Sequence, residues 1–205
     1  MELGVYEVVK WFELANEKIQ QNKEYLTSLD QPIGDGDHGI NMARGYQEAV
    51  NKLQANEYKE PSAVLKDASM ALLSKIGGAS GPLYGTAFLK MSMAVKGKKD
   101  LAIGDLAEGL EAAVEGLKQR GKSEVGEKTL IDVWEPVANY FSRDNFEPKG
   151  ISEIARTAME MTKETVATKG RAAYFKEKSI GHIDPGSASS YYIFQALADV
   201  IKEKE

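Results

Sequence analysis

The spacing of apolar residues is the feature that most constrains the fold of this chain. Along most of its 205 residues, apolar side chains recur every three or four positions, which places them on one face of an α-helix. No segment shows the two-residue alternation of a convincing β-strand, and the short run 191–194 lies inside a longer helical pattern. The sequence therefore predicts an all-α fold.

Eight segments carry this pattern, and glycine, proline or capping residues separate them. Ser152 is a good N-cap for the seventh segment, and Pro136 should either kink the sixth or mark its true first turn. The expected helices are residues 5–27, 39–53, 60–76, 81–91, 105–120, 129–141, 152–168 and 187–202.

Composition and charge exclude several classes of function. With 42% hydrophobic residues, a chain of 205 residues is expected to form one domain, 1–205. The net charge of -5 and the pI of about 5.3 offer no basic face for nucleic acid, and the absence of cysteine excludes disulfides and thiolate chemistry. The longest uncharged run, 76–89, contains four glycines and a proline. We therefore expect no signal peptide, no membrane span and a cytoplasmic location.

The most distinctive polar segment is 30–41, with the sequence DQPIGDGDHGIN. Asp30, Asp35 and Asp37 fall within eight positions, and carboxylates this close repel one another unless a hard divalent cation lies between them. The glycines among them let the backbone approach a ligand, and the helix that follows begins where a phosphate can bind. The alternative is a solvated Asp/Gly turn that only caps a helix.

Two of three named loop patterns match the chain by letter, but none fits its context. Gly34, Gly36 and Gly39 match the dinucleotide fingerprint, yet a helix-like segment stands where that fingerprint requires a strand. An EF-hand loop opening at Asp35 fails at its third ligand, its glycine and its closing glutamate. Residues 116–123 match the P-loop, but they follow an amphipathic helix instead of a buried strand.

Other joints between the expected helices are also unusual. Residues 75–85 hold four glycines around Ala79 and Ser80, just before a helix, where free backbone N–H groups and a hydroxyl can face an anion. The connection 168–186 is long, and connections of that length in compact domains are usually functional or disordered. Residues 120–129 are expected to form a further flexible, charged joint.

In these joints the chain resembles the nucleotide-binding L subunit, or L domain, of dihydroxyacetone kinases. The matching motifs follow one another in order over nearly the whole chain: Asp30 with 33–39, then 77–81, 119–122 with 126–134, 168–174, and 179–186. The resemblance implies a barrel of eight antiparallel amphipathic helices. It also implies that interhelical loops at one end hold ADP or ATP through two magnesium ions.

The resemblance further implies which residues form the site. The aspartates that match the family's metal ligands are Asp30, Asp35 and Asp37. The nucleotide-binding positions carried over by motif are His38, Gly39, Ile40, Asn41, Ala79, Ser80, Gly121, Leu130, Arg171, Asp184, Pro185 and Gly186. Arg171 can bind phosphate or stabilise the transferring charge, with a solvated surface arginine as the alternative, and Leu130 can equally be a core residue.

As a member of this family, the chain is expected to pass a phosphoryl group to dihydroxyacetone held on a separate K subunit, and to be inactive alone. Phosphoryl transfer needs mainly positioning and charge neutralisation, so we expect no general base here. Two phosphate sources are open. One is an exchangeable ATP; the other is a bound ADP that a DhaM-like phosphocarrier of the sugar phosphotransferase system rephosphorylates, and a free-standing L chain favours the second. An ADP-loaded module that docks on a regulator or on another kinase is the alternative from a different functional class.

Overall fold

Helices account for most of the residues that the computed structural model describes, which are 2–143 and 146–204. The prediction of an all-helical fold is confirmed, apart from two very short strands. None of the helices in these ranges combines the length and apolarity that crossing a membrane requires. The elements are, in chain order, β1 (Glu2–Leu3), α1 (Val5–Gln21), α2 (Lys23–Asp30), α3 (His38–Gln54), α4 (Pro61–Lys75), α5 (Ser80–Ala94), β2 (Leu101–Ala102), α6 (Ile103–Gly121), α7 (Ile131–Phe141), α8 (Pro148–Met161), η1 (Thr162–Glu164), η2 (Arg171–Ser179) and α9 (Pro185–Lys202).

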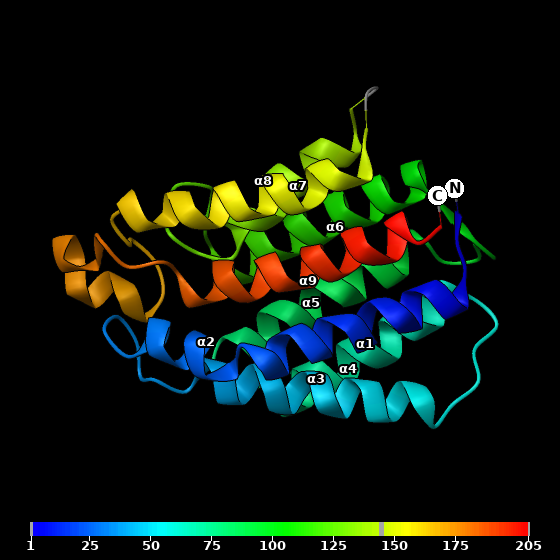
Figure 1. Ribbon diagram of the computed structural model, residues 1–205, viewed down its shortest axis with the longest axis horizontal. Coiled ribbons are helices and arrows are strands. Elements are labelled where there is room, and N and C mark those ends of the chain that lie inside the picture. Colours follow the sequence, from blue (N-terminus) through cyan, green and yellow to red (C-terminus); the bar gives the residue numbers. More distant parts are fainter. Residues whose placement is uncertain (1, 144–145, 205) are drawn as a thin grey trace.

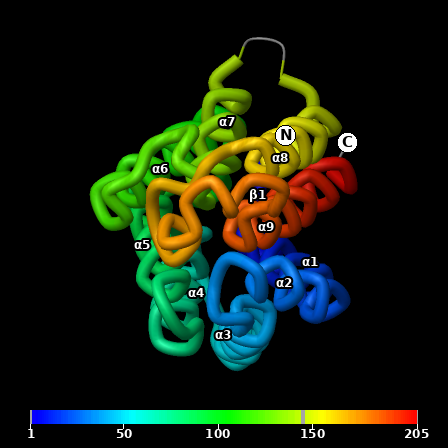
Figure 2. The backbone as a smooth tube through the Cα atoms, turned by 90° about the vertical axis from the view of Figure 1, so that its left-hand side faces the viewer, coloured from blue at the N-terminus to red at the C-terminus, as the bar shows by residue number. Residues whose placement is uncertain are grey.

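The long helices lie side by side along the longest axis of the molecule (Figure 1). Helix α1 packs against α3 and α9, and from α3 onward each α-helix packs against the next one in the chain. Strand β1 and the end of α9 lie at one end of the molecule, whereas the α2–α3 loop and η2 lie together at the other end, which Figure 2 views. The packing therefore brings loops that are far apart in sequence to one end.

Aromatic residues from four helices meet in the core. The ring centroid of Phe88 in α5 lies 4.9 Å from that of Phe12 in α1 and 5.7 Å from that of Trp134 in α7. Trp134 in turn lies 4.9 Å from Phe194 in α9, and its Nε1 donates a 2.9 Å hydrogen bond to Ser190 Oγ. Burying one such ring contributes about 2–3 kcal/mol, so this cluster holds together the helices α5, α7 and α9, whose first residues reach the loop end.

The prediction of one helix over residues 5–27 is wrong. The structure has two helices, α1 and α2, separated by Asn22, whose backbone leaves helical geometry at φ -109° and ψ 15°. The Asn22 side chain donates a 2.8 Å hydrogen bond to the carbonyl of Lys18, which also accepts from the Asn22 backbone N–H at 3.1 Å, so Asn22 caps the end of α1. Helix α2 then packs against α3, and its last residue, Asp30, lies beside the start of α3.

The predicted seventh helix, 152–168, has different ends. Helix α8 begins four residues earlier with Glu147 as its N-cap, so Ser152 is not the cap. It ends at Met161, and the 3₁₀ turn η1 follows. The carbonyl of Thr162 accepts a 2.6 Å hydrogen bond from Lys128 Nζ and a 3.2 Å hydrogen bond from the N–H of Thr165, three residues on, which is the bond of a 3₁₀ turn.

Further differences are local. Strands β1 and β2 pair antiparallel, with Glu2 opposite Ala102, and two residues are too few to leave an alternating pattern. Part of the expected loop 168–186 forms η2. Helix α9 begins before Ser187, because Asp184 caps it, and Pro136 lies inside α7 and not at its first turn.

Candidate functional site

The α2–α3 loop and η2 come together at one end of the molecule (Figure 2). A pocket lies among the residues there. Four connections form its walls: the α2–α3 loop, the α4–α5 joint, the α6–α7 joint and the segment between η1 and α9. Its lining residues are Asp30, Ile33, Asp35, Asp37, His38, Asn41, Gly77, Gly78, Ala79, Ser80, Leu83, Lys128, Thr129, Leu130, Lys169, Gly170, Arg171, Ala172, Asp184, Pro185 and Gly186.

Most of the site residues predicted from the sequence line this pocket, but Gly39, Ile40 and Gly121 do not. A Cβ at Gly39 would lie 2.0 Å from the carbonyl oxygen of Lys23, so close packing of α3 on α2 requires this glycine. Ile40 is 54% exposed on α3. A Cβ at Gly121 would lie 3.3 Å from Leu83 Cδ2, so Gly121 lies directly behind a lining residue.

The acidic loop brings three carboxylates together. One ligand oxygen from each of Asp30, Asp35 and Asp37 lies within 4.8 Å of the others. Asp30 Oδ2 accepts hydrogen bonds from the backbone N–H groups of Asp37 (2.9 Å) and His38 (3.1 Å), which closes the loop on the end of α2. A Cβ at Gly34 would lie 1.9 Å from Asp30 Oδ1, so only glycine leaves room for this arrangement.

This cluster suits a hard divalent cation. Carboxylates so close together repel one another, and carboxylate oxygens are the ligands that Mg²⁺ takes. Arg171 forms an ion pair with Asp35, which compensates one of the three charges. Asp35 and Asp37 are exposed at the mouth of the pocket, where a ligand can reach them. Because Mg²⁺ is commonly bound by a few carboxylates together with phosphate oxygens, the donor set fits a magnesium–phosphate ligand.

His38 is buried at the start of α3. Its Nε2 lies 2.9 Å from Ser189 Oγ and its Nδ1 lies 3.4 Å from Ser80 Oγ. Burial lowers the pKa of His38 to about 4, so the ring is neutral near pH 7 and serves as a hydrogen-bonding group. Ser189 Oγ also lies 2.7 Å from the hydroxyl of Tyr84, so a buried polar network holds the histidine in place.

The sequence analysis did not identify Ser189 and Tyr84. The available signal was the group of serines at 187, 189 and 190 within the apolar pattern of the last helix, since buried hydroxyls need partners.

The start of α5 forms another wall of the pocket. The first N–H groups of a helix have no intrahelical acceptor and carry partial positive charge, which suits phosphate. Ser80 is the first residue of α5, and Gly78, two residues earlier, has φ +64°. A Cβ at Gly77 would lie 2.9 Å from Asn41 Oδ1, so glycine lets this joint pass close to α3.

Two cationic side chains of the segment between η1 and α9, Lys169 and Arg171, line the pocket. Arg171 follows Gly170, whose φ of +64° favours glycine, and its guanidinium reaches Asp35 of the acidic loop. The Arg171 side chain is 58% exposed, so it lies at the open side of the pocket. Lys169 Nζ lies 3.9 Å from a carboxylate oxygen of Glu127. This segment therefore supplies two cationic side chains to the lining of the pocket.

Asp184 and Leu130 form part of the floor. Asp184 Oδ2 accepts a 2.6 Å hydrogen bond from the N–H of Ser187 at the start of α9, and the N–H of Asp184 donates to Thr162 Oγ1 at 3.0 Å. Burial raises the pKa of Asp184 to about 7. Leu130 is 5% exposed and also lines the pocket, so it belongs to both the core and the site.

Lys128 was missed by the sequence analysis. The joint 120–129 was expected to be flexible and charged, but Lys128 is 1% exposed, and its Nζ is hydrogen-bonded to backbone carbonyls. Those carbonyls lie 34 to 54 residues later in the chain, so no local pattern could reveal them. Burial lowers the pKa of this lysine.

The sequence is similar to known proteins over most of its length. The family model described as the DAK2 domain matches residues 32–199. A Listeria innocua protein described as PEP-dependent dihydroxyacetone kinase 1, ADP-binding subunit DhaL, is 49% identical over 92% of this chain and 93% of its own length. The PTS-dependent counterpart of Lactococcus lactis is 44% identical over 97% of this chain and 99% of its own length.

A solved structure has a similar fold. The dihydroxyacetone kinase from C. freundii in complex with AMP-PNP and Mg²⁺ aligns with 94% of this chain at a TM-score of 0.74 and 22% identity. The alignment covers 33% of that kinase chain, so the present chain corresponds to about a third of it.

Proposed function

This chain belongs to the DAK2 domain family, among the ADP-binding DhaL subunits of dihydroxyacetone kinases, and on that premise we propose that it binds ADP or ATP with Mg²⁺ in the pocket described above. It is a phosphotransferase subunit that passes a phosphoryl group to dihydroxyacetone on a separate K subunit. The observation that carries the proposal is the convergence of Asp30, Asp35 and Asp37 in the pocket that also contains the start of α5. These two features suit the metal and the phosphates of one ligand.

Each wall of the pocket has a proposed task. Asp30, Asp35 and Asp37 would hold two Mg²⁺ ions, and the bound metal supplies charge neutralisation at the phosphates. The N–H groups at the start of α5 and the Ser80 hydroxyl bind phosphate oxygens. Arg171 presents a planar set of donors to the transferring group. The remaining proposed nucleotide-binding residues that line the pocket are His38, Asn41, Ala79, Leu130, Asp184, Pro185 and Gly186. Gly39, Ile40 and Gly121, which do not line it, complete the proposed set.

We also propose that the chain keeps ADP as a coenzyme, which a DhaM-like phosphocarrier rephosphorylates. The relatives from Listeria innocua and Lactococcus lactis are described as PEP-dependent and PTS-dependent, which supports a phosphocarrier over free ATP as the donor. The exposed position of Arg171 is compatible with two protein partners that reach the same nucleotide in turn.

For the fold, we propose a closed barrel of eight antiparallel helices formed by α1 and α3 to α9. Two observations support it: each α-helix from α3 to α8 packs against the next one in the chain, and α9 packs against α1, which contacts α3. Helix α2 then lies outside the ring and carries Asp30 to the pocket.

The test uses Asp37→Asn, which removes one charge from the proposed metal site. We expect nucleotide affinity to fall by about tenfold or more, which corresponds to about 1.4 kcal/mol, while circular dichroism shows unchanged helix content. The matched control is Asp199→Asn in α9, because Asp199 pairs with Lys18 outside the pocket. Mass spectrometry of the native protein measures bound nucleotide and magnesium, and transfer is measured with a K subunit in excess. Full retention and full transfer by Asp37→Asn would overturn the metal assignment.

A further inference from the structure

The ammonium group of Lys128 lies among backbone carbonyls of the segment between α8 and α9. Lys128 Nζ donates to the carbonyl oxygens of Thr162 (2.6 Å), Ser179 (2.8 Å) and His182 (2.5 Å), and the carbonyl of Thr165 lies 3.2 Å away. An ammonium has three protons, so these four acceptors account for its full hydrogen-bonding capacity. A lysine that binds phosphate needs a free ammonium, and Lys128 does not have one.

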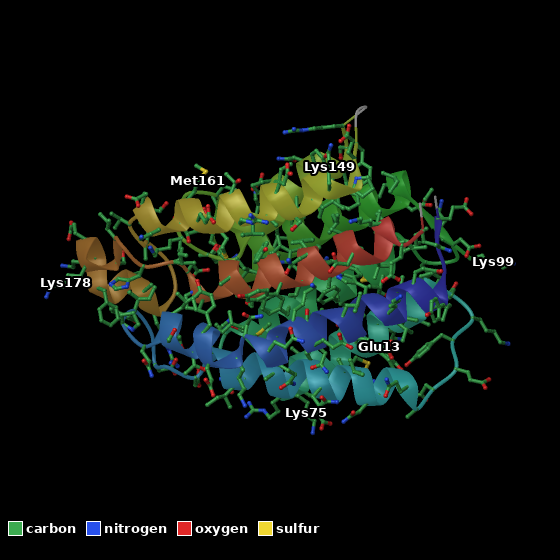
Figure 3. The ribbon with its side chains drawn as sticks, in the orientation of Figure 1. Glu13, Lys75, Lys99, Lys149, Met161 and Lys178 are labelled. Carbon is green, nitrogen blue, oxygen red and sulfur yellow. The ribbon has the colours of Figure 1, made fainter. Side chains whose placement is uncertain are left out.

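The four carbonyls come from both ends of one segment, 162–182. Most residues between these ends are exposed, and the buried apolar residues in the segment, Ala167 and Ala172, form only a small cluster with Ile33, separate from the main core. Figure 3 shows Lys178 of this segment at the outer end of the molecule, pointing away from the helices. Because apolar packing is sparse, the bonds to Lys128 are a principal attachment of the segment to the rest of the fold.

The backbone at Lys128 supports a specific role. Its φ of +62° lies in the left-handed region, which is unfavourable for a residue with a side chain. A buried ammonium is also costly unless its hydrogen bonds are satisfied. The unfavourable backbone and the buried ammonium therefore occur together at one residue, and its side chain contacts the segment that carries Gly170 and Arg171.

We infer that Lys128 is a positioning residue, which fastens both ends of the segment 162–182 to the joint before α7 and thereby holds Arg171 beside the acidic loop. The connection runs from the Lys128 ammonium through the carbonyls of Thr162 and Ser179 to η2, whose first residue, Arg171, pairs with Asp35. The consequence for catalysis rests on the proposed function, whereas the fastening of the segment does not.

The first test is hydrogen–deuterium exchange of nucleotide-free protein. Lys128→Met keeps the apolar part of the side chain and removes the donor. We expect amides in 163–182 to exchange at least about tenfold faster, which is about 1.4 kcal/mol of lost protection, while those of the α-helices are unchanged. Lys122→Met is the matched control, because Lys122 also has a left-handed backbone, φ +53°, but is exposed. Unchanged exchange in 163–182 would overturn the inference.

The second test is chemical rescue. Lys128→Ala leaves space among the four carbonyls for a small organic cation, and we expect methylammonium to restore slow exchange in 163–182, whereas sodium at the same ionic strength does not. Rescue would show that the ammonium itself holds the segment, even if Lys128→Met folds poorly. Failure of methylammonium to change the exchange of Lys128→Ala would contradict the inference.

The third test separates positioning from general stability by a double-mutant cycle on phosphoryl transfer, with the K subunit in excess. We expect Lys128→Met to slow transfer by about tenfold in the wild-type background and by much less when Arg171→Ala is already present. Two full, additive losses would overturn the positioning role. The proposed function would be contradicted if the wild-type chain transferred no phosphoryl group. Faster exchange of 163–182 in Lys128→Met would, in that case, still support the attachment of the segment by Lys128.

Discussion

Replacing Arg171 by lysine separates the charge of this residue from its geometry. The Arg171 side chain is 58% exposed and that of its partner Asp35 is 42% exposed, so the ion pair between them contributes at most about 1 kcal/mol to folding. Lysine keeps the charge, and the variant should therefore fold normally. A guanidinium can place two parallel donors on a phosphate, and an ammonium cannot reproduce that fork.

The expected loss follows from one charge-assisted hydrogen bond, which is worth about 1.5–3 kcal/mol. If that bond forms only with the transferring group, Arg171→Lys should keep its bound nucleotide and transfer phosphate at least about tenfold more slowly, since tenfold is about 1.4 kcal/mol. Bound nucleotide is measured by mass spectrometry, and the rate is measured with the K subunit in excess. Arg156→Lys, on the exposed face of α8, is the control.

Two other outcomes would refute this reasoning. Loss of nucleotide together with activity would mean that Arg171 anchors the ground state and has no special role in transfer. Unchanged nucleotide retention and an unchanged transfer rate would indicate that Arg171 is a solvated surface arginine with no role in transfer.

Two further predictions concern the acidic loop and the pH dependence of stability. Gly34→Ala places a Cβ 1.9 Å from Asp30 Oδ1, so Asp30 must move and lose its hydrogen bonds to the loop. Thermal unfolding should show that the free energy of unfolding falls by about 2 kcal/mol, and nucleotide retention should also fall. Gly104→Ala, which has open space around its Cβ, is the control and should change neither quantity. The raised pKa of Asp184, about 7 against an ordinary 3.8, lowers stability as pH rises from about 4 to 7, and the lowered pKa of His38, about 4 against 6.5, raises stability over pH 4 to 6.5. Asp184→Asn removes the first effect. Its free energy of unfolding, measured in urea without nucleotide or magnesium, should therefore rise with pH between 4 and 6.5 more steeply than that of the wild type, by at most about 1.4 kcal/mol per pH unit. Equal slopes for the two proteins would contradict this assignment.

Local chemistry made most of the helices predictable. The apolar period of α3, α4 and α6 is a property of neighbouring residues, and so are the proline at the start of α4 and the glycine joint before α5. The same reasoning missed the break at Asn22, because the apolar stripe continues across it although the Asn22 backbone leaves helical geometry and its side chain hydrogen-bonds to the Lys18 carbonyl. The apolar period shows which residues face the core, but it does not show where a polar side chain hydrogen-bonds to a backbone carbonyl.

The acidic loop was also visible in the sequence, because three carboxylates and three glycines within a few positions have a chemical meaning wherever the loop lies. What surrounds that loop was decided by the tertiary structure. Packing of α5 and α9 places Ser80 and Ser189 on either side of His38, and the long-range bonds of Lys128 fix the segment that carries Arg171. The sequence by itself thus determined the helices and the carboxylates, since both depend on nearby residues. Only the fold decided which polar groups are buried and what they hold, because the burial of a histidine or a lysine depends on partners that lie tens or hundreds of residues away in the chain.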